Sequence, residues 1–335
     1  MKLRSIGIFW ISFFIAFTPC VSLAQNASET KTLERNIRAE LGFLASDAMQ
    51  GRGSGSGYER LAAEYIGSQF RQFGLEPAGD KDATGEQTFV QRALLSSSKL
   101  TEAATFTWNA VGVLRGSDPT ASKEVIMLSA HLDHLGTIEN AAPGTDAIFN
   151  GADDDASGCV AVLELARALV SGKRPKRTIY FVCFGSEERG GYGAQYFVAH
   201  SPVALEQIVA DVTFEMLGRP DSKVPANTLW LTGYERSTLG PELAQHGALL
   251  VADPHPQQNF FQRSDNYTLA LRGVVAHTVS SFGLHTDYHR PSDDISKIDF
   301  VFMTRAIASL IKPIRWLADS SFKPAWLPGK MPTRG

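Results

Sequence analysis

Short apolar runs alternate with segments of helical periodicity along most of this chain. Apolar, often β-branched runs predict strands at residues 111–114, 125–128, 178–184, 208–214, 228–231 and 273–279. Amphipathic or helix-favouring segments predict helices at 58–73, 156–170, 190–199, 239–251, 264–271 and 300–316. Because strands and helices alternate, we predict an α/β fold with a mixed, mostly parallel central sheet and helices on both faces.

The first 24 residues have the pattern of a secretory signal peptide. A basic start precedes an apolar run at 6–17, and small residues follow at 22–24. We expect cleavage after Ala24, export to the periplasm or the extracellular space, and no stable membrane insertion afterwards. The alternatives are an uncleaved membrane anchor, for which the run is short, and a lipid anchor at Cys20, which follows an unfavourable Thr-Pro pair.

Composition and charge narrow the class of partner. The chain has 335 residues, of which 44% are hydrophobic and 20% charged, as in ordinary globular domains. The net charge is −3 and becomes −5 (−3 − 2) once the two basic residues of the signal peptide are removed. This mild acidity argues against nucleic acid as a partner. Cys159 and Cys183 lie in apolar runs, so we expect buried thiols and no cysteine metal site.

Histidine and acidic residues follow two of the predicted strands. His131 and Asp133 come after the second strand, and residues two apart in an extended segment point to one side. Glu187 and Glu188 come after the third strand. A cation would stabilise one of these adjacent carboxylates and leave the other free as a general base with a tuned pKa. Taken alone, His131 and Asp133 are better explained as polar surface residues at a strand end, and Glu187 and Glu188 are explained equally well as an exposed acidic turn.

Three consecutive acids, Asp153, Asp154 and Asp155, precede the helix predicted from residue 156. One acid would suffice to cap the helix and to interact with its dipole. Three neighbouring carboxylates repel one another unless a cation lies between them. We therefore favour a carboxylate that bridges two metal ions over a simple cap.

Two further segments complete this pattern. Glu215 directly follows the strand predicted at 208–214, and the segment 285–294, with two histidines and three aspartates, follows the last strand. Because ligands bind beyond the carboxyl ends of parallel strands, we expect all these side chains at one edge of the sheet. Nitrogen and oxygen donors without a thiolate suit two divalent ions that share a carboxylate.

Taken in order, these segments resemble a zinc-dependent exopeptidase family that includes secreted bacterial leucyl-type aminopeptidases, glutamate carboxypeptidase and glutaminyl cyclase. The resemblance spans about residues 35–310 and is carried by the segments 129–133, 151–158, 186–188, 214–216 and 287–294. Further likeness lies at 51–53, 109–113 and 263–266. It implies a phosphorylase/hydrolase-like fold over 25–335 and a zinc aminopeptidase that cleaves peptides with a free N-terminus. The chain between 87 and 125 is too short for the protease-associated domain inserted in some members.

The resemblance also implies a set of metal ligands. Asp154 would bridge two Zn²⁺ ions, with other divalent metals as alternatives. His131 and Glu215 would complete one ion, and Glu188 and His289 the other. Glu215 departs from the family pattern, in which this position is often Asp, but Glu offers the same donor atoms.

The resemblance assigns two further roles. Glu187 would be the general base and acid, and Asp133 would support the site from behind the ligands. Asn266 stands where relatives often carry His, which puts in question any substrate contact near Asp265.

Other functions stay open on the sequence. A glutaminyl cyclase-like acyltransferase would use one zinc ion on a similar scaffold, and a carboxypeptidase would need a cationic pocket, for which Arg219, Arg263 and Arg290 are candidates. A non-catalytic binding domain is less consistent with a full set of ligands and a base. The chain has no Gly-x-Ser-x-Gly elbow of a serine hydrolase. Its Gly-rich segment 51–57 lacks the Lys-Ser/Thr of a phosphate loop.

Overall fold

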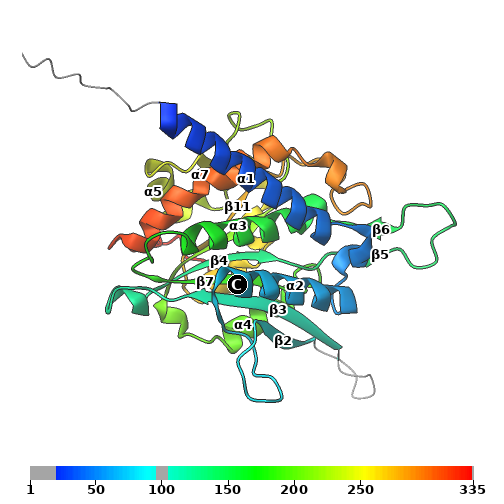
Figure 1. The fold of residues 1–335 in the computed structure, drawn as a ribbon, viewed down its shortest axis with the longest axis horizontal. Helices are drawn as coiled ribbons and strands as arrows, with labels where there is room; N and C mark the ends of the chain where they lie inside the picture. The colour runs from blue at the N-terminus through cyan, green and yellow to red at the C-terminus, as the bar shows by residue number, and fades with distance from the viewer. Residues whose placement is uncertain (1–19, 96–104, 334–335) are drawn as a thin grey trace, which may run out of the picture.

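A computed structural model describes residues 20–95 and 105–333 of the chain. Within these residues a nine-stranded sheet lies between layers of helices (Figure 1). Most of the expected signal peptide lies outside the described part, and its last residues begin helix α1 (Cys20–Leu44). None of the helices in the described part is long and apolar enough to cross a membrane.

The sheet is mixed, and its centre is parallel. Its strands are β1 (Glu76–Pro77), β2 (Val90–Leu95), β3 (Thr105–Leu114), β4 (Val125–His131), β7 (Thr178–Phe184), β8 (Ile208–Glu215), β9 (Leu229–Leu231), β10 (Leu250–Ala252) and β11 (Ala276–Ser280). Their order is β1-β3-β7-β4-β8-β11-β9-β10, with β2 paired to β3. The four central strands β7, β4, β8 and β11 run parallel, whereas β3 and β9 are antiparallel to them. This arrangement confirms the predicted fold class.

Helices cover both faces of the sheet. They are α1, α2 (Gly57–Phe73), α3 (Gly158–Val170), α4 (Tyr192–Ala199), α5 (Leu239–Gln245), α6 (Asn266–Ala270) and α7 (Phe300–Asp319). Helices α1, α2, α3 and α7 share the larger core, and α4 and α6 pack on the opposite face (Figure 1). Strand β7 contributes side chains to both cores, since Phe181 packs in the larger one and Val182 in the smaller one. This double burial explains why its sequence is a continuous apolar run.

Several predicted boundaries are wrong. The helix predicted over 239–251 ends at Gln245, because Gly247 adopts a φ of +105°, and the remainder forms β10. A π-helical segment, Ala152–Ser157, precedes α3, which therefore begins at Gly158 rather than at residue 156. Strand β11 begins at Ala276 rather than at residue 273. The short hairpin of β5 (Gly136–Thr137) and β6 (Ile148–Phe149) was not predicted.

The two cysteines behave as predicted. Cys159 and Cys183 are free and buried. Cys159 Sγ lies 3.1 Å from the carbonyl oxygen of His131, so this thiol packs directly behind the end of β4.

Candidate metal centre

The predicted site residues converge beyond the carboxyl ends of the central strands. His131 is the last residue of β4, and Glu215 is the last residue of β8. Glu188 lies in the turn after β7, and His289 in the loop after β11. Because β7, β4, β8 and β11 are adjacent and parallel, these four positions open onto one edge of the sheet.

Asp154 lies at the centre of the predicted ligands. Its Oδ1 is 3.1 Å from Nε2 of His131, and its Oδ2 is 3.2 Å from Nε2 of His289. The same nitrogen of His289 lies 3.1 Å from Oε2 of Glu188. His131 and Asp154 are almost fully buried, whereas the His289 side chain is 35% exposed. One carboxylate thus faces an imidazole on each side, as a bridging group would.

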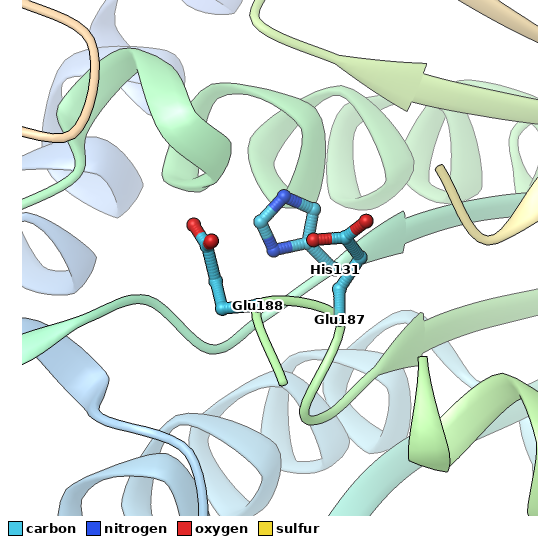
Figure 2. A group of neighbouring side chains, drawn as sticks. All are labelled: His131, Glu187 and Glu188. Carbon is cyan, nitrogen blue, oxygen red and sulfur yellow. The ribbon is translucent and has the colours of Figure 1, made fainter. Parts of the chain in front are cut away.

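Glu187 and Glu188 project from the same turn on either side of the ring of His131 (Figure 2). One donor atom from each of these three residues lies within 4.8 Å of the others, and a second such group combines His134, Asp154 and Glu188. Glu188 belongs to both groups. The predicted base, Glu187, therefore lies as close to the ligands as a ligand itself would.

Glu215 belongs to the same pocket. The acidic wall of this pocket is formed by Asp154, Glu187, Glu188 and Glu215. Burial raises the pKa of Glu215, while the neighbouring charge of His131 lowers it. The remaining lining comprises an apolar wall of Met216, Trp230, Phe260, Phe282 and Tyr288, together with the polar side chains of Thr232, Arg263, Thr278 and Ser280.

Asp155 holds two strand ends together through backbone hydrogen bonds. Its Oδ2 accepts a hydrogen bond from the backbone N–H of His131 (3.1 Å), and its Oδ1 accepts bonds from those of Gly158 (3.0 Å) and Met216 (3.1 Å). These bonds tie the start of α3 to the ends of β4 and β8. The carboxylate of Asp155 is therefore already used by the scaffold.

Asp153 also serves the scaffold. It accepts a hydrogen bond from the backbone N–H of Gly218 (2.7 Å), and its Oδ2 lies 3.0 Å from Nε2 of His285. The carboxylate of Asp293 in turn accepts bonds from the backbone N–H groups of Asp153 and Asp154. Of the three consecutive acids, Asp154 is the one that presents its carboxylate to both His131 and His289.

Asp133 supports both the ligand and the predicted base. Its Oδ1 accepts a hydrogen bond from the backbone N–H of Glu187 (2.9 Å) and lies 3.7 Å from Nδ1 of His131. Its Oδ2 accepts a hydrogen bond from the hydroxyl of Ser54. Asp133 is completely buried, so these contacts fix the turn after β7 relative to the end of β4.

His134 is a site residue that the sequence reasoning missed. Its Nδ1 lies 2.8 Å from Oε1 of Glu188, and its ring meets that of His289 edge-on at 5.7 Å. The residue is fully buried. Its position three residues after His131, in the same motif, was the available signal.

The acids and histidines of the site shift one another's pKa values. Although burial opposes ionisation, the close contacts with His131 and His289 hold the pKa of Asp154 well below its usual range. Burial also disfavours charge on the histidines, yet the same carboxylates raise the pKa of His289 to about 10 and that of His131 well above its ordinary value. Burial, by contrast, raises the pKa of Glu187.

The donor set fits divalent metal ions. Within the described part of the chain, Asp154 Oδ2 and His134 Nε2 are buried and make no hydrogen bond of good geometry. Imidazole nitrogens and carboxylate oxygens are the donors that zinc accepts in catalytic sites, usually with an open position for substrate. A cation between Asp154 and Glu188 would also relieve the repulsion of the acidic wall.

Comparisons with known sequences agree with this geometry. A sequence profile of peptidase family M28 matches residues 109–312. Leupeptin-inactivating enzyme 1 of Streptomyces exfoliatus is 27% identical over 191 residues, which are 56% of this chain and 36% of that protein. Leucine aminopeptidase 2 of Trichophyton rubrum is 27% identical over 236 residues, which are 61% of this chain and 44% of that protein. The chain thus spans less than half the length of these two relatives.

Solved structures share the fold. The aminopeptidase of Aneurinibacillus sp. strain AM-1 has a TM-score of 0.64 at 15% identity, covering 91% of this chain and 99% of that chain. Glutaminyl cyclase of Porphyromonas gingivalis has a TM-score of 0.60 at 18% identity, covering 85% and 97%. At such low identity the likeness concerns the fold alone. Because the profile match covers more than half of the 335 residues, the chain belongs to peptidase family M28.

Proposed function

We propose that this protein is a metallo-aminopeptidase that hydrolyses the N-terminal peptide bond of peptides with a dinuclear zinc site. The observation that carries this proposal is the gathering of His131, Glu188 and His289 around the carboxylate of Asp154. Asp154, Glu187 and Glu188 line the same pocket. The family of the chain and the names of its aminopeptidase relatives support the same reaction class.

In this proposal Asp154 is shared between two zinc ions. His131 and Glu215 would complete one ion, and Glu188 and His289 the other. When bound, zinc supplies a Lewis acid that polarises the scissile carbonyl and lowers the pKa of water. The contacts of about 3 Å between Asp154 and the two histidines support its bridging role. Other divalent ions would suit the same donors.

Glu187 would move the proton. Its backbone is held by Asp133, and its side chain lies in the pocket beside His131. Burial raises its pKa, and bound cations would act in the opposite direction. Because these two influences on the pKa of Glu187 oppose each other, its carboxylate is suited to accept a proton from the attacking water first and then to donate it to the leaving amine.

The apolar wall of the pocket would accept the substrate's N-terminal side chain. Trp230 and Phe260 stack at 5.4 Å, and Phe282 packs against Phe260 and Tyr288. A large apolar side chain would bury its surface against these rings, while the acidic wall would attract the substrate's α-ammonium group. We therefore propose a preference for peptides that begin with a bulky apolar residue.

A substrate panel tests this function against its two nearest rivals. Purified protein, loaded with zinc, would be assayed on a leucine-terminated amide, on a glutamine-terminated peptide and on an N-blocked peptide with a free carboxylate. We expect release of leucine and no action on the blocked peptide. Cyclisation of the glutamine peptide would instead indicate a cyclase, and cleavage of the blocked peptide a carboxypeptidase.

The three arginines that could form the cationic pocket of a carboxypeptidase have different surroundings. Arg219 pairs with Asp287 at 2.8 Å, so its charge is already engaged. Arg263 lines the pocket, but its guanidinium lies over the ring of Phe260 and donates to the hydroxyl of Tyr288. Arg290 is exposed and does not line this pocket. This distribution gives the carboxypeptidase less support than the aminopeptidase.

We also propose that the protein is exported, as the first 24 residues suggest. Fractionation of expressing cells and N-terminal sequencing would test this. We expect the purified protein to begin at Gln25, directly after Ala24. A protein that keeps residue 1 and stays in the cytoplasm would contradict export and leave the proposed catalytic activity untouched.

A further inference from the structure

The Gly-rich segment from Gly51 to Glu59 lies far from the metal ligands in sequence but next to them in space. It precedes the residues matched by the family profile, which begin at 109. It nevertheless contacts the loop after β4, the segment before α3 and the turn after β7. These are the three places that carry His131, Asp154 and Glu187.

Arg52 anchors this segment. Its buried guanidinium donates hydrogen bonds to the carbonyl oxygens of Leu44 (2.6 Å), Leu132 (2.9 Å), Asn150 (2.7 Å) and Gly151 (3.0 Å). One side chain therefore joins the loop that follows β4 and its ligand His131 to the segment that precedes α3 and carries the three acids. A buried guanidinium whose donors are satisfied by carbonyls fixes their separation.

Ser54 contacts Asp133, the residue that supports the predicted base. Its hydroxyl donates to Oδ2 of Asp133, whose Oδ1 accepts the backbone N–H of Glu187. The backbone N–H of Ser54 also donates to the carbonyl oxygen of His134. Ser54 therefore orients the carboxylate that holds the turn of Glu187.

Glu59 holds the same turn from its other side. Its Oε1 accepts hydrogen bonds from the backbone N–H (2.9 Å) and the hydroxyl (3.2 Å) of Ser186, and one from the hydroxyl of Thr107. Its Oε2 accepts the backbone N–H of Gly55 (2.7 Å). Ser186 adopts a φ of +54°, an uncommon conformation for a non-glycine residue that external hydrogen bonds help to maintain.

The path of the segment requires glycine at residue 51. Gly51 has a φ of +65°, and a Cβ atom there would collide with the carbonyl oxygens of Gly136 and Phe149. The close approach to the β5–β6 hairpin brings Ser54 and Glu59 to the site. The glycines are thus explained by geometry and not by a ligand.

We propose that Ser54 and Glu59 are positioning residues that set the orientation of Glu187 by holding Asp133 and Ser186 on either side of its turn. This inference rests on the proposed function, in which Glu187 is the general base. It assigns to the Gly51–Glu59 segment a role in the reaction rather than in folding alone.

Matched serine variants separate these roles. Ser54→Ala removes the hydroxyl that holds Asp133, and Ser54→Thr retains one. Ser68→Ala is the control from outside this segment, because Ser68 is exposed on α2 and its hydroxyl donates to the carbonyl oxygen of Tyr65. Glu59→Gln replaces one carboxylate oxygen of Glu59, which accepts hydrogen bonds, with an amide NH₂ group, which donates them. Zinc content, kcat and KM for a leucine amide, and amide hydrogen exchange of the metal-free protein would be measured for each.

We expect Ser54→Ala and Glu59→Gln to lower kcat by about 10- to 100-fold with KM and zinc content little changed. Amides of residues 186–188 should exchange faster, Ser54→Thr should recover most of kcat, and Ser68→Ala should keep it. An unchanged kcat in Ser54→Ala, or an equal loss in Ser68→Ala, would overturn the proposal. A wild-type protein without peptidase activity, but with faster exchange in the two variants, would overturn the proposed function and leave the hold on the turn intact.

Discussion

Glu187 and Glu188 are neighbours in sequence, yet their surroundings differ. Glu188 faces two imidazoles, at 2.8 Å from His134 and 3.1 Å from His289. Burial and the charge of Asp154 oppose its ionisation, but these hydrogen bonds lower its pKa. Burial instead raises the pKa of Glu187. The two carboxylates are therefore suited to different tasks, one to hold a cation and the other to carry a proton.

Replacing either glutamate by glutamine separates these tasks. Glu187→Gln should retain zinc, because its neighbours supply the ligands, while kcat falls by about 10²- to 10⁴-fold through loss of acid–base catalysis. Glu188→Gln should lose zinc as well as activity. Metal analysis and steady-state kinetics on both proteins check this. A Glu187→Gln protein with nearly normal kcat would remove that residue from the proton transfer.

Asp154 should matter for metal binding more than any other acid of its loop. Asp154→Asn removes the charge that both His131 and His289 approach, so we expect loss of at least one equivalent of zinc. The control is Asp146→Asn, because Asp146 is an exposed acid in the preceding loop. Zinc content after dialysis gives the comparison. Retention of two ions by Asp154→Asn would contradict a bridging role.

At the level of elements, the central strands and the residues at their ends were predictable. Strands β4, β7 and β8 are buried apolar runs that stop where a polar residue is needed at the pocket. Their parallel order brings those ends together, so the gathering of His131, Glu188 and Glu215 followed from pattern and topology. The choice of Asp154 among three acids came from family resemblance, and only the contacts of Asp153 and Asp155 give its physical reason.

Other features depend on contacts between distant segments, which periodicity does not reveal. The segment from Gly51 to Glu59 has no apolar pattern, and its importance arises from hydrogen bonds to residues about 80 to 130 positions away. The sequence pattern indicates no role for His134, whereas the contact of its ring with Glu188 places it in the site. Strand β10 is three residues long, and the helical pattern before it concealed the turn at Gly247.

Strand β11 carries a buried histidine that links stability to pH. Nδ1 of His277 lies 2.7 Å from the carbonyl oxygen of Thr232, and Nε2 lies 2.7 Å from the hydroxyl of Ser237. Burial lowers its pKa to about 4 from an ordinary value of 6.5. The unfolded chain therefore binds a proton that the folded protein excludes between these two values. The stability present above pH 6.5 is lost as the pH falls towards 4.

His277→Gln should remove this pH dependence. The wild-type free energy of unfolding should fall by about 3 kcal/mol more than that of the variant between pH 7 and pH 4, from about 2.5 units of pKa at 1.36 kcal/mol each. Denaturant titrations of both proteins at the two pH values measure this difference. Parallel losses in the two proteins would show that His277 is not the group responsible.

For the molecule as a whole, protons and metal ions compete for one centre. In the metal-free protein the carboxylates raise the pKa of His289 to about 10 and that of His131 well above its usual value. The imidazole of His289 is therefore protonated at pH 7, whereas zinc binds the neutral ring. Loading the site must expel this proton, which couples metal affinity to pH.

Zinc binding should release at least the proton of His289 at pH 7, since the pKa of this imidazole lies at about 10. Affinity should therefore increase as the pH rises, because fewer protons compete. Calorimetric titrations in buffers of different ionisation enthalpy measure the number released. Heats that do not depend on the buffer, together with an affinity that is the same at pH 6 and pH 8, would contradict this account of the metal-free centre.

The central claim is that two zinc ions and Glu187 together make an aminopeptidase. The most direct test is a titration of the metal-free protein with zinc, in which hydrolysis of a leucine amide is followed at each addition. The account predicts that activity rises until about two equivalents are bound, consistent with a two-metal site, and that Glu187→Gln binds the same two without gaining activity. Full activity at one equivalent, or two bound equivalents with no hydrolysis, would contradict it.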